Sequence, residues 1–146
     1  MAHMVLEKRT NMACTAVYEA FTLADNALAH LDNMRETIGS IAVAGASIRV
    51  LSKEIDEILF SRETEQEVTV LDILVRPGEA CDIRPNSNQQ ACAFLISGRA
   101  TINGAEAQKN ELHVCAEGEP LRISTKGLLP CRVVYCASEP ENREIR

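Results

Sequence analysis

The spacing of apolar side chains changes near residue 40, from a helical period to short strand-like runs. From Cys14 to Ile38 apolar residues recur every three or four positions, which predicts an amphipathic helix ended by Gly39. We expect the apolar stripe of this helix to pack on the rest of the chain or, alternatively, on a second copy of it. The stripe consists of Val17, Phe21, Ala24, Leu28, Leu31 and Ile38, with Met34 beside them.

Beyond residue 40, runs rich in Val, Ile and Leu are separated by turn residues, a pattern typical of an all-β sandwich or barrel. Ile41–Leu51 fits a strand interrupted by a turn or bulge at Gly45, and Asn103-Gly104 predicts a tight hairpin. Ser52–Thr64 fits either an irregular edge segment or a helical turn. The other predicted strands are Glu67–Val75, Ala91–Ser97, Arg99–Ile102, Ala105–Gln108, Leu112–Cys115, Leu121–Thr125 and Cys131–Ala137, with a loop at Asp82–Gln90.

Length and charge narrow the class of protein. A chain of 146 residues suits one domain, with a helical segment at 12–40 and a β-barrel at 41–138. Residues 1–4 resemble a cloning remnant, so His3 is left out of every site. The net charge of −6 and the lack of a basic run exclude nucleic acid as a main partner. No apolar stretch is long enough to span a membrane and no signal peptide is evident, so we expect a cytoplasmic protein.

Six cysteines lie mostly inside the apolar strand runs and not in loops. This placement favours buried free thiols over disulfides. The chain has no Cys-x-x-Cys motif, and its nearest pair, Cys131 and Cys136, has four residues between its members along a predicted strand. We therefore expect no zinc site.

The stretch from Pro77 to Gly98 has a spacing that resembles the first motif of the cupin barrels. That motif runs glycine, five residues, His-x-His, four residues, Glu, six residues and glycine, and Gly78 and Gly98 match its two glycines. The metal-ligand positions of this motif and of the second cupin motif are occupied here by Arg84, Asn86, Ala91 and Leu121. Since a cupin metal needs imidazole and carboxylate donors, the resemblance implies a cupin-like double-stranded β-helix, or jelly-roll barrel, without a metal or other cofactor.

Within the cupins, the region from Ser47 to Pro140 is most similar to the carboxy-terminal domain of the pirin family. The likeness rests on the order of the segments VTVLDILVRPGE, AFLISGRATING, ELHVCAEGEPLRIS and LLPCRVVYCASEP. Pirins have two tandem cupins, with the metal site in the amino-terminal one. In this chain a helical segment stands in the place of that barrel, so the resemblance does not imply the dioxygenase or transcription-cofactor activity of pirins.

Arg84 is the main candidate for contact with a ligand. A guanidinium at a barrel mouth favours a carboxylate or phosphate, and neighbouring amides could add contacts to a small anionic ligand. The alternative is a solvated loop in which Arg84 points to water. Independently, Arg132 is expected to pair with Asp72 in a structural role. The candidate ligand residues are Arg84, Asn86, Gln90 and His113, although His113 also fits a buried strand histidine.

The strand that begins at Ala91 separates into two faces. If Ala91 faces the barrel interior, as a metal ligand in its place would, the outward side chains are Cys92, Phe94 and Ile96. So apolar a face is not left in water, and something is expected to cover it. The helical stripe supplies the predicted cover through Phe21, Leu28 and Leu31, from the same chain or from a symmetric partner.

These observations predict a non-catalytic, metal-free cupin that binds a protein partner or a small anionic ligand, as a homodimer. One alternative is a cupin-type enzyme, an isomerase or dioxygenase with an atypical site. Another is a regulatory domain similar to the cyclic-nucleotide-binding jelly rolls, but their phosphate-binding cassette is not found at Gly118-Glu119, where Pro120 and a strand follow at once.

Overall fold

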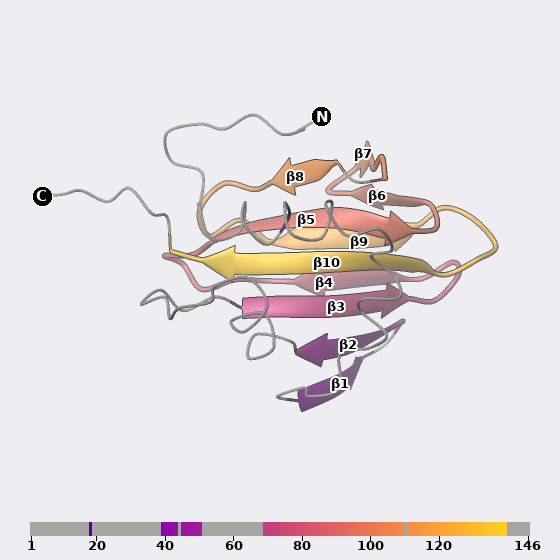
Figure 1. Ribbon diagram of the computed structural model, residues 1–146, viewed down its shortest axis with the longest axis horizontal. Helices are drawn as coiled ribbons and strands as arrows, with labels where there is room; N and C mark the ends of the chain where they lie inside the picture. The colour runs from indigo at the N-terminus through magenta and orange to yellow at the C-terminus, as the bar shows by residue number, and fades with distance from the viewer. Residues whose placement is uncertain (1–17, 19–38, 44, 51–68, 110, 140–146) are drawn as a thin grey trace, which may run out of the picture.

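The computed structural model describes residues 18, 39–43, 45–50, 69–109 and 111–139. These residues form ten strands in two antiparallel sheets, one of order β1-β2-β3-β10-β5-β8 and one of order β4-β9-β6-β7 (Figure 1). The bounds are β1 Gly39–Val43, β2 Ala46–Val50, β3 Thr69–Val75, β4 Ala80–Ile83, β5 Gln90–Ser97, β6 Ala100–Ile102, β7 Ala105–Glu106, β8 Leu112–Val114, β9 Leu121–Thr125 and β10 Cys131–Ser138. The prediction of a mainly β protein is therefore confirmed.

The predicted amphipathic helix from Cys14 to Ile38 lies outside the described residues, apart from Tyr18. No helix is among the elements that the structure describes, so the helical part of the predicted fold is not supported. The ambiguous segment Ser52–Thr64 is also outside the described residues. Within the described ranges, no helix has the length and apolar character needed to cross a bilayer.

Local turn chemistry explains why most strand boundaries match the sequence pattern. Gly45 has a φ of +87° and closes a hairpin, so the predicted interrupted strand is in fact the pair β1 and β2. Asn103 and Gly104 have φ values of 51° and 84° and join β6 to β7 in the predicted tight turn. The strand β4 was not predicted: its last two residues fall in the predicted loop Asp82–Gln90, and its first two directly precede that loop.

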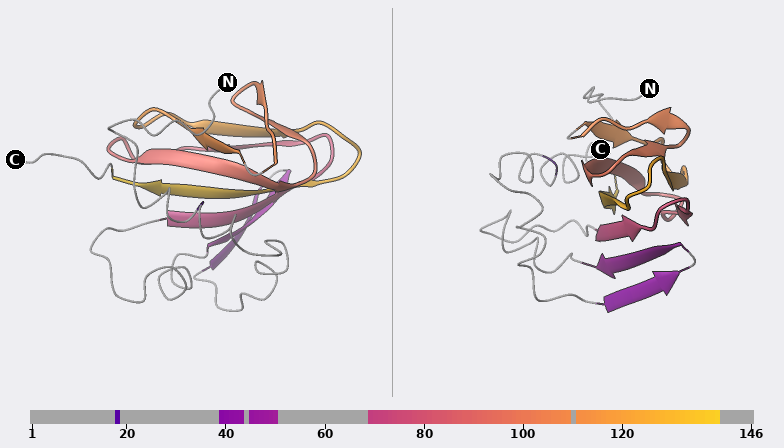
Figure 2. Two further views of the ribbon diagram at one scale, coloured as in Figure 1. Left: turned by 45° about the horizontal axis from the view of Figure 1, so that its top comes forward. Right: turned by 90° about the vertical axis from the view of Figure 1, so that its right-hand side faces the viewer.

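The two sheets face each other across one hydrophobic core, and β1 and β2 extend the six-stranded sheet at one side (Figure 2). At Gly98 the backbones of two strands come so close that a Cβ atom would lie 2.5 Å from the carbonyl oxygen of Pro130. Only glycine fits there, which ties the end of β5 to the start of β10. The inward side chains of the six-stranded sheet include Ala46, Ile48, Ile73, Val75, Ala91, Ala93, Leu95, Cys131, Val133, Tyr135 and Ala137.

Candidate functional site

The four residues at the metal-ligand positions of the cupin motifs lie in two different environments. Arg84 and Asn86 are exposed in the loop that follows β4. Ala91 on β5 and Leu121 on β9 belong to the hydrophobic core, and each is 0% exposed. Across the described ranges, no group of three or more His, Cys, Asp or Glu side chains is placed to hold a metal ion. The residues present therefore do not fit the metal that these motifs hold in other proteins.

The loop around Arg84 uses its amides to stabilise itself. The backbone N–H of Asn86 donates to Gln89 Oε1 at 3.1 Å, and the N–H of Gln89 donates back to the carbonyl of Asn86 at 3.0 Å. Asn88 Nδ2 donates to Glu139 Oε2 at 2.8 Å. Arg84 itself is exposed and makes no hydrogen bond or ion pair with the residues described. Its guanidinium is thus available to a ligand.

The other two predicted ligand residues are buried on opposite faces of the six-stranded sheet. Gln90 lies on the outer face, and its Nε2 donates to the carbonyl of Cys115 at 3.0 Å. His113 lies directly opposite Ala93 in the register of β5 and β8, so it shares the inner face with that core residue. Its Nε2 is 3.8 Å from Glu111 Oε1. The structure therefore does not gather the four predicted residues into one site.

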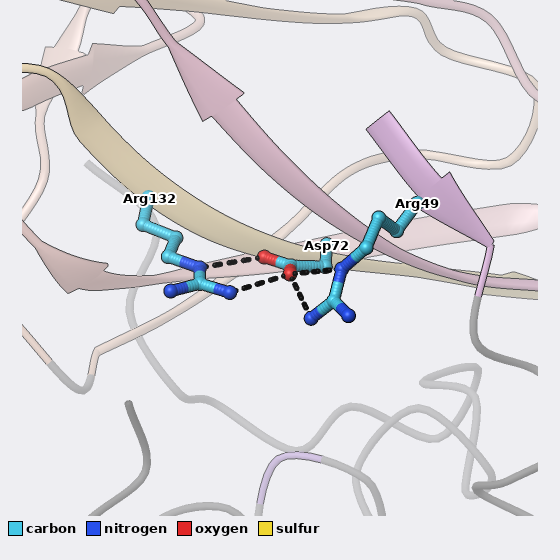
Figure 3. Close-up of polar contacts among 3 residues, drawn as sticks. All are labelled: Arg49, Asp72 and Arg132. Carbon is cyan, nitrogen blue, oxygen red and sulfur yellow. Dashed lines mark hydrogen bonds and ion pairs between the residues drawn. The ribbon is translucent and has the colours of Figure 1, made fainter. Parts of the chain in front are cut away.

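A charged cluster lies on the outer face of the same sheet (Figure 3). Asp72, on β3 and 4% exposed, lies between Arg49 on β2 and Arg132 on β10. Arg132 donates from Nε to Oδ1 at 2.9 Å and from Nη2 to Oδ2 at 2.8 Å. Arg49 donates to Oδ2 from Nε at 3.1 Å and from Nη2 at 2.7 Å. The predicted pair of Asp72 and Arg132 is thus present, and Arg49 completes a triad that the sequence pattern did not indicate.

The electrostatics of Asp72 depend on these two arginines. Burial alone raises the pKa of its carboxyl group, but the hydrogen bonds and charges of Arg132 and Arg49 outweigh burial and lower it below the ordinary value of 3.8. Asp72 is therefore ionised at neutral pH, and the triad carries one net positive charge. Because each carboxylate oxygen accepts a charge-assisted bond, the cluster is a firm link between three neighbouring strands.

The apolar side chains predicted to point outward from β5 do so. Cys92, Phe94 and Ile96 alternate with core residues, yet they are only 2%, 1% and 4% exposed. The ring of Tyr18 packs edge-on against Phe94, with centroids 5.2 Å apart and planes at 80°. The predicted covering residues Phe21, Leu28 and Leu31 lie outside the described residues. The outer face is thus covered, and Tyr18 is a described part of the cover.

Comparisons with known proteins bear on the fold. No family model and no curated protein matches the sequence. Among solved structures, quercetin 2,3-dioxygenase from Acinetobacter baumannii aligns with a TM-score of 0.58 at 19% identity, over 73% of this chain and 35% of its own. GK1651 from Geobacillus kaustophilus aligns with a TM-score of 0.57 at 16% identity, over 78% and 46%. The cupin_2 domain of an XRE family transcriptional regulator from Enterobacter cloacae aligns with a TM-score of 0.50 at 11% identity, over 66% and 99%.

This chain has the cupin fold. The three neighbours agree on the architecture, but at 11–19% identity they establish the fold alone. The chain spans less than half the length of the two larger neighbours. A specific similarity to pirins is not among these findings.

The described thiols are buried and free, as their strand positions predicted. Cys81, Cys92, Cys115, Cys131 and Cys136 form no disulfide and are buried, whereas Cys14 lies outside the described residues. Burial raises the pKa of Cys115 to about 12 and that of Cys131 to about 11. A thiol nucleophile needs the opposite shift, so neither residue is a catalytic candidate.

The arginine and glutamate near Gly118 do not form the phosphate-binding site that the regulatory alternative requires. On the cupin sheet, Arg122 Nη1 donates to both carboxylate oxygens of Asp82, at 3.0 and 2.8 Å. Glu119 Oε1 accepts the backbone N–H of Ala116 at 2.7 Å within a turn. Both side chains serve local structure, which gives the cyclic-nucleotide comparison no support.

Proposed function

We propose that this chain is a cupin-fold protein that acts by binding, as an interaction module, and not by catalysis at a cupin metal centre. The observation that carries the proposal is that Ala91 and Leu121, at two metal-ligand positions, are core residues with 0% exposure. Neither side chain has a donor atom. A cationic Arg84 at a third position opposes a bound cation further.

The order of the β-segments supports a finer proposal, that the chain is nearest to the carboxy-terminal cupin domain of pirins. In that family this domain has generally lost its metal ligands. The present core, with Ala91 and Leu121 at the ligand positions, has the same character. The predicted homodimer is part of this proposal, and sedimentation of the purified chain checks it.

A small anion is the ligand chemistry that Arg84 favours. Its guanidinium is exposed and makes no bond with the described residues, whereas Asn88 and Gln89 are occupied within the loop. Calorimetric titration with inorganic phosphate and with citrate tests this part. Binding that disappears in Arg84→Ala would support it, and equal heats for Arg84→Ala and the unaltered protein would exclude Arg84.

Metal analysis tests the proposal itself. The full-length protein is incubated with Fe²⁺, Mn²⁺, Ni²⁺ or Zn²⁺, passed over a desalting column, and analysed by inductively coupled plasma mass spectrometry. We expect far less than one metal ion per chain, because the buried residues at two metal-ligand positions, Ala91 and Leu121, have no side-chain atom that can bind a metal. Stoichiometric metal in the unaltered protein would overturn the proposal.

One observation favours the enzyme alternative. His113 and Tyr135 lie on either side of Ala93 on the inner face of the sheet, so two buried polar side chains flank a small residue in the barrel. Quercetin 2,3-dioxygenase shows that enzymes use this fold. Stoichiometric metal that is lost in His113→Asn would support an atypical enzyme site built on this histidine.

A further inference from the structure

The outer face of the six-stranded sheet changes from apolar to charged along a single row of paired residues. In the strand registers this row runs through Leu112, Phe94, Val134, Asp72 and Arg49, on β8, β5, β10, β3 and β2. The first three side chains are apolar and 0–1% exposed. The last two, joined by the diagonal neighbour on β10, form the triad with its net positive charge (Figure 3).

The adjacent row of outward-facing residues on the same sheet is also apolar. Cys92, Cys136 and Val70 lie opposite one another on β5, β10 and β3, and they are 0–2% exposed. The four-stranded sheet packs on the other, inner face, so it does not cover these residues. Tyr18 does reach this face, where its ring contacts Phe94. The surface thus offers an apolar half and a cationic half to whatever covers it.

We propose that this face is a docking surface for an acidic amphipathic segment, and that its occupant is residues 14–38 of the same chain, the segment that contains Tyr18. The inference is separate from the proposed function, since it concerns how the chain covers its own sheet. The apolar stripe of the segment matches the apolar half of the face. Its acidic residues, Glu19, Asp25, Asp32 and Glu36 against the single Arg35, complement the positive triad.

The path of the chain favours an occupant in the same molecule. The segment connects Tyr18, over β5, to Gly39, where β1 begins at the far edge of the same sheet. Four inter-strand steps separate β5 from β1, a distance of roughly 19 Å. A stretch of 20 residues, the number between Tyr18 and Gly39, spans about 30 Å even as a helix, which is long enough to cross the face. Any direct route between those ends passes over the charged half.

Thiol labelling of the full-length protein tests the proposal, because the cysteines report on the two faces separately. Cys92 and Cys136 lie under the proposed occupant, whereas Cys81 and Cys131 lie between the sheets. Leu28→Glu places a charge in the apolar stripe. We expect it to raise N-ethylmaleimide labelling of Cys92 and Cys136 about tenfold or more, the effect of losing one buried leucine, with Cys81 and Cys131 unchanged.

Asn26→Glu is the matched control, since it adds the same charge to the polar side of the segment. It should leave every labelling rate unchanged. Unaltered labelling of Cys92 and Cys136 in Leu28→Glu would overturn the proposal. So would labelling in the unaltered protein that rises on dilution, because that result assigns the cover to a second copy.

If Leu28→Glu unfolds the chain, the unaltered protein decides the matter in low concentrations of urea. Labelling of Cys92 and Cys136 before Cys81 and Cys131 supports a cover that leaves before the sandwich opens. Simultaneous labelling of all four overturns it. None of these results bears on metal content, so the proposed function and this inference fail separately.

Discussion

Replacing Asp72 by asparagine isolates the contribution of the charged triad to stability. Asparagine is nearly the same in shape as aspartate, so the substitution Asp72→Asn removes the charge and leaves Arg49 and Arg132 facing each other. Breaking a buried ion pair in this way costs about 3–5 kcal/mol. Because the Arg49 side chain is 28% exposed, water relieves part of the strain, and we expect a loss of about 3 kcal/mol in the free energy of unfolding.

The same substitution at Asp82 provides a matched control. Asp82 also accepts two hydrogen bonds from one arginine, Arg122, but the two side chains are 65% and 59% exposed. Exposed pairs of this kind contribute roughly 0–1 kcal/mol, since water screens the charges. The difference between the two variants therefore measures the effect of burial.

The pH dependence gives the prediction a second, independent part. The pKa of Asp72 is lower in the folded protein than in the unfolded chain, so its stabilising effect is present above the unfolded value and is lost as the pH falls through the folded value. The gap in stability between the unaltered protein and Asp72→Asn should accordingly be constant near neutral pH. It should narrow below about pH 4, where the unfolded carboxyl begins to bind protons.

Urea unfolding followed by far-ultraviolet circular dichroism is the suitable assay, because the chain has no tryptophan and only two tyrosines. Two results would refute the reasoning. One is a loss in Asp72→Asn no larger than that in Asp82→Asn. The other is a gap that stays the same from pH 7 to pH 2.

Three further predictions concern the cover, a backbone approach and a thiol. Phe94→Ala should lower the free energy of unfolding by about 3–5 kcal/mol. A double-mutant cycle with Tyr18→Ala, measured in the same urea assay, should give a coupling energy of about 0.5–1.5 kcal/mol between the two rings. A coupling energy of zero would contradict the ring contact. Gly104→Ala should lower the free energy of unfolding by about 1–2 kcal/mol. This is the penalty of a positive φ alone, because the new Cβ atom would lie in open space. Gly98→Ala should cost more, because its Cβ would overlap backbone atoms, and equal melting temperatures for the two variants would exclude this explanation. Cys115, with its pKa raised to about 12, should react with maleimide far more slowly in the native protein than in the unfolded chain at every pH from 7 to 9.5, because its thiolate is scarce throughout this range; equal labelling rates in the two states would contradict the shift.

The sequence by itself determined the parts of this protein that depend on near neighbours. The turns at Gly45 and Asn103-Gly104 were predictable because positive φ is a property of a few residue types. The strand β9 was predicted with its observed bounds, since alternation and flanking turn residues are local signals. The strand β4 was missed because it is short and its partner, β9, lies about 40 residues away in the chain.

The candidate site divides in the same way. The lack of donors at Ala91 and Leu121, and the outward direction of Phe94, followed from the resemblance to the cupin motifs together with the two-residue period of a strand. Spacing could not show that Gln90 and His113 lie on opposite faces, because a shift of one residue in register moves a side chain to the other side of a sheet.

Only the tertiary structure decided which distant residues meet. Asp72 pairs with Arg49 because β2 and β3 are neighbours in register, and with Arg132 because β10 is inserted between β3 and β5. Sheet order is set by the summed burial of many side chains, so no single stretch of sequence encodes it. The contact of Tyr18 with Phe94 is of the same kind: the sequence predicted that the outer face needs a cover, and the folded chain shows one residue of it in place.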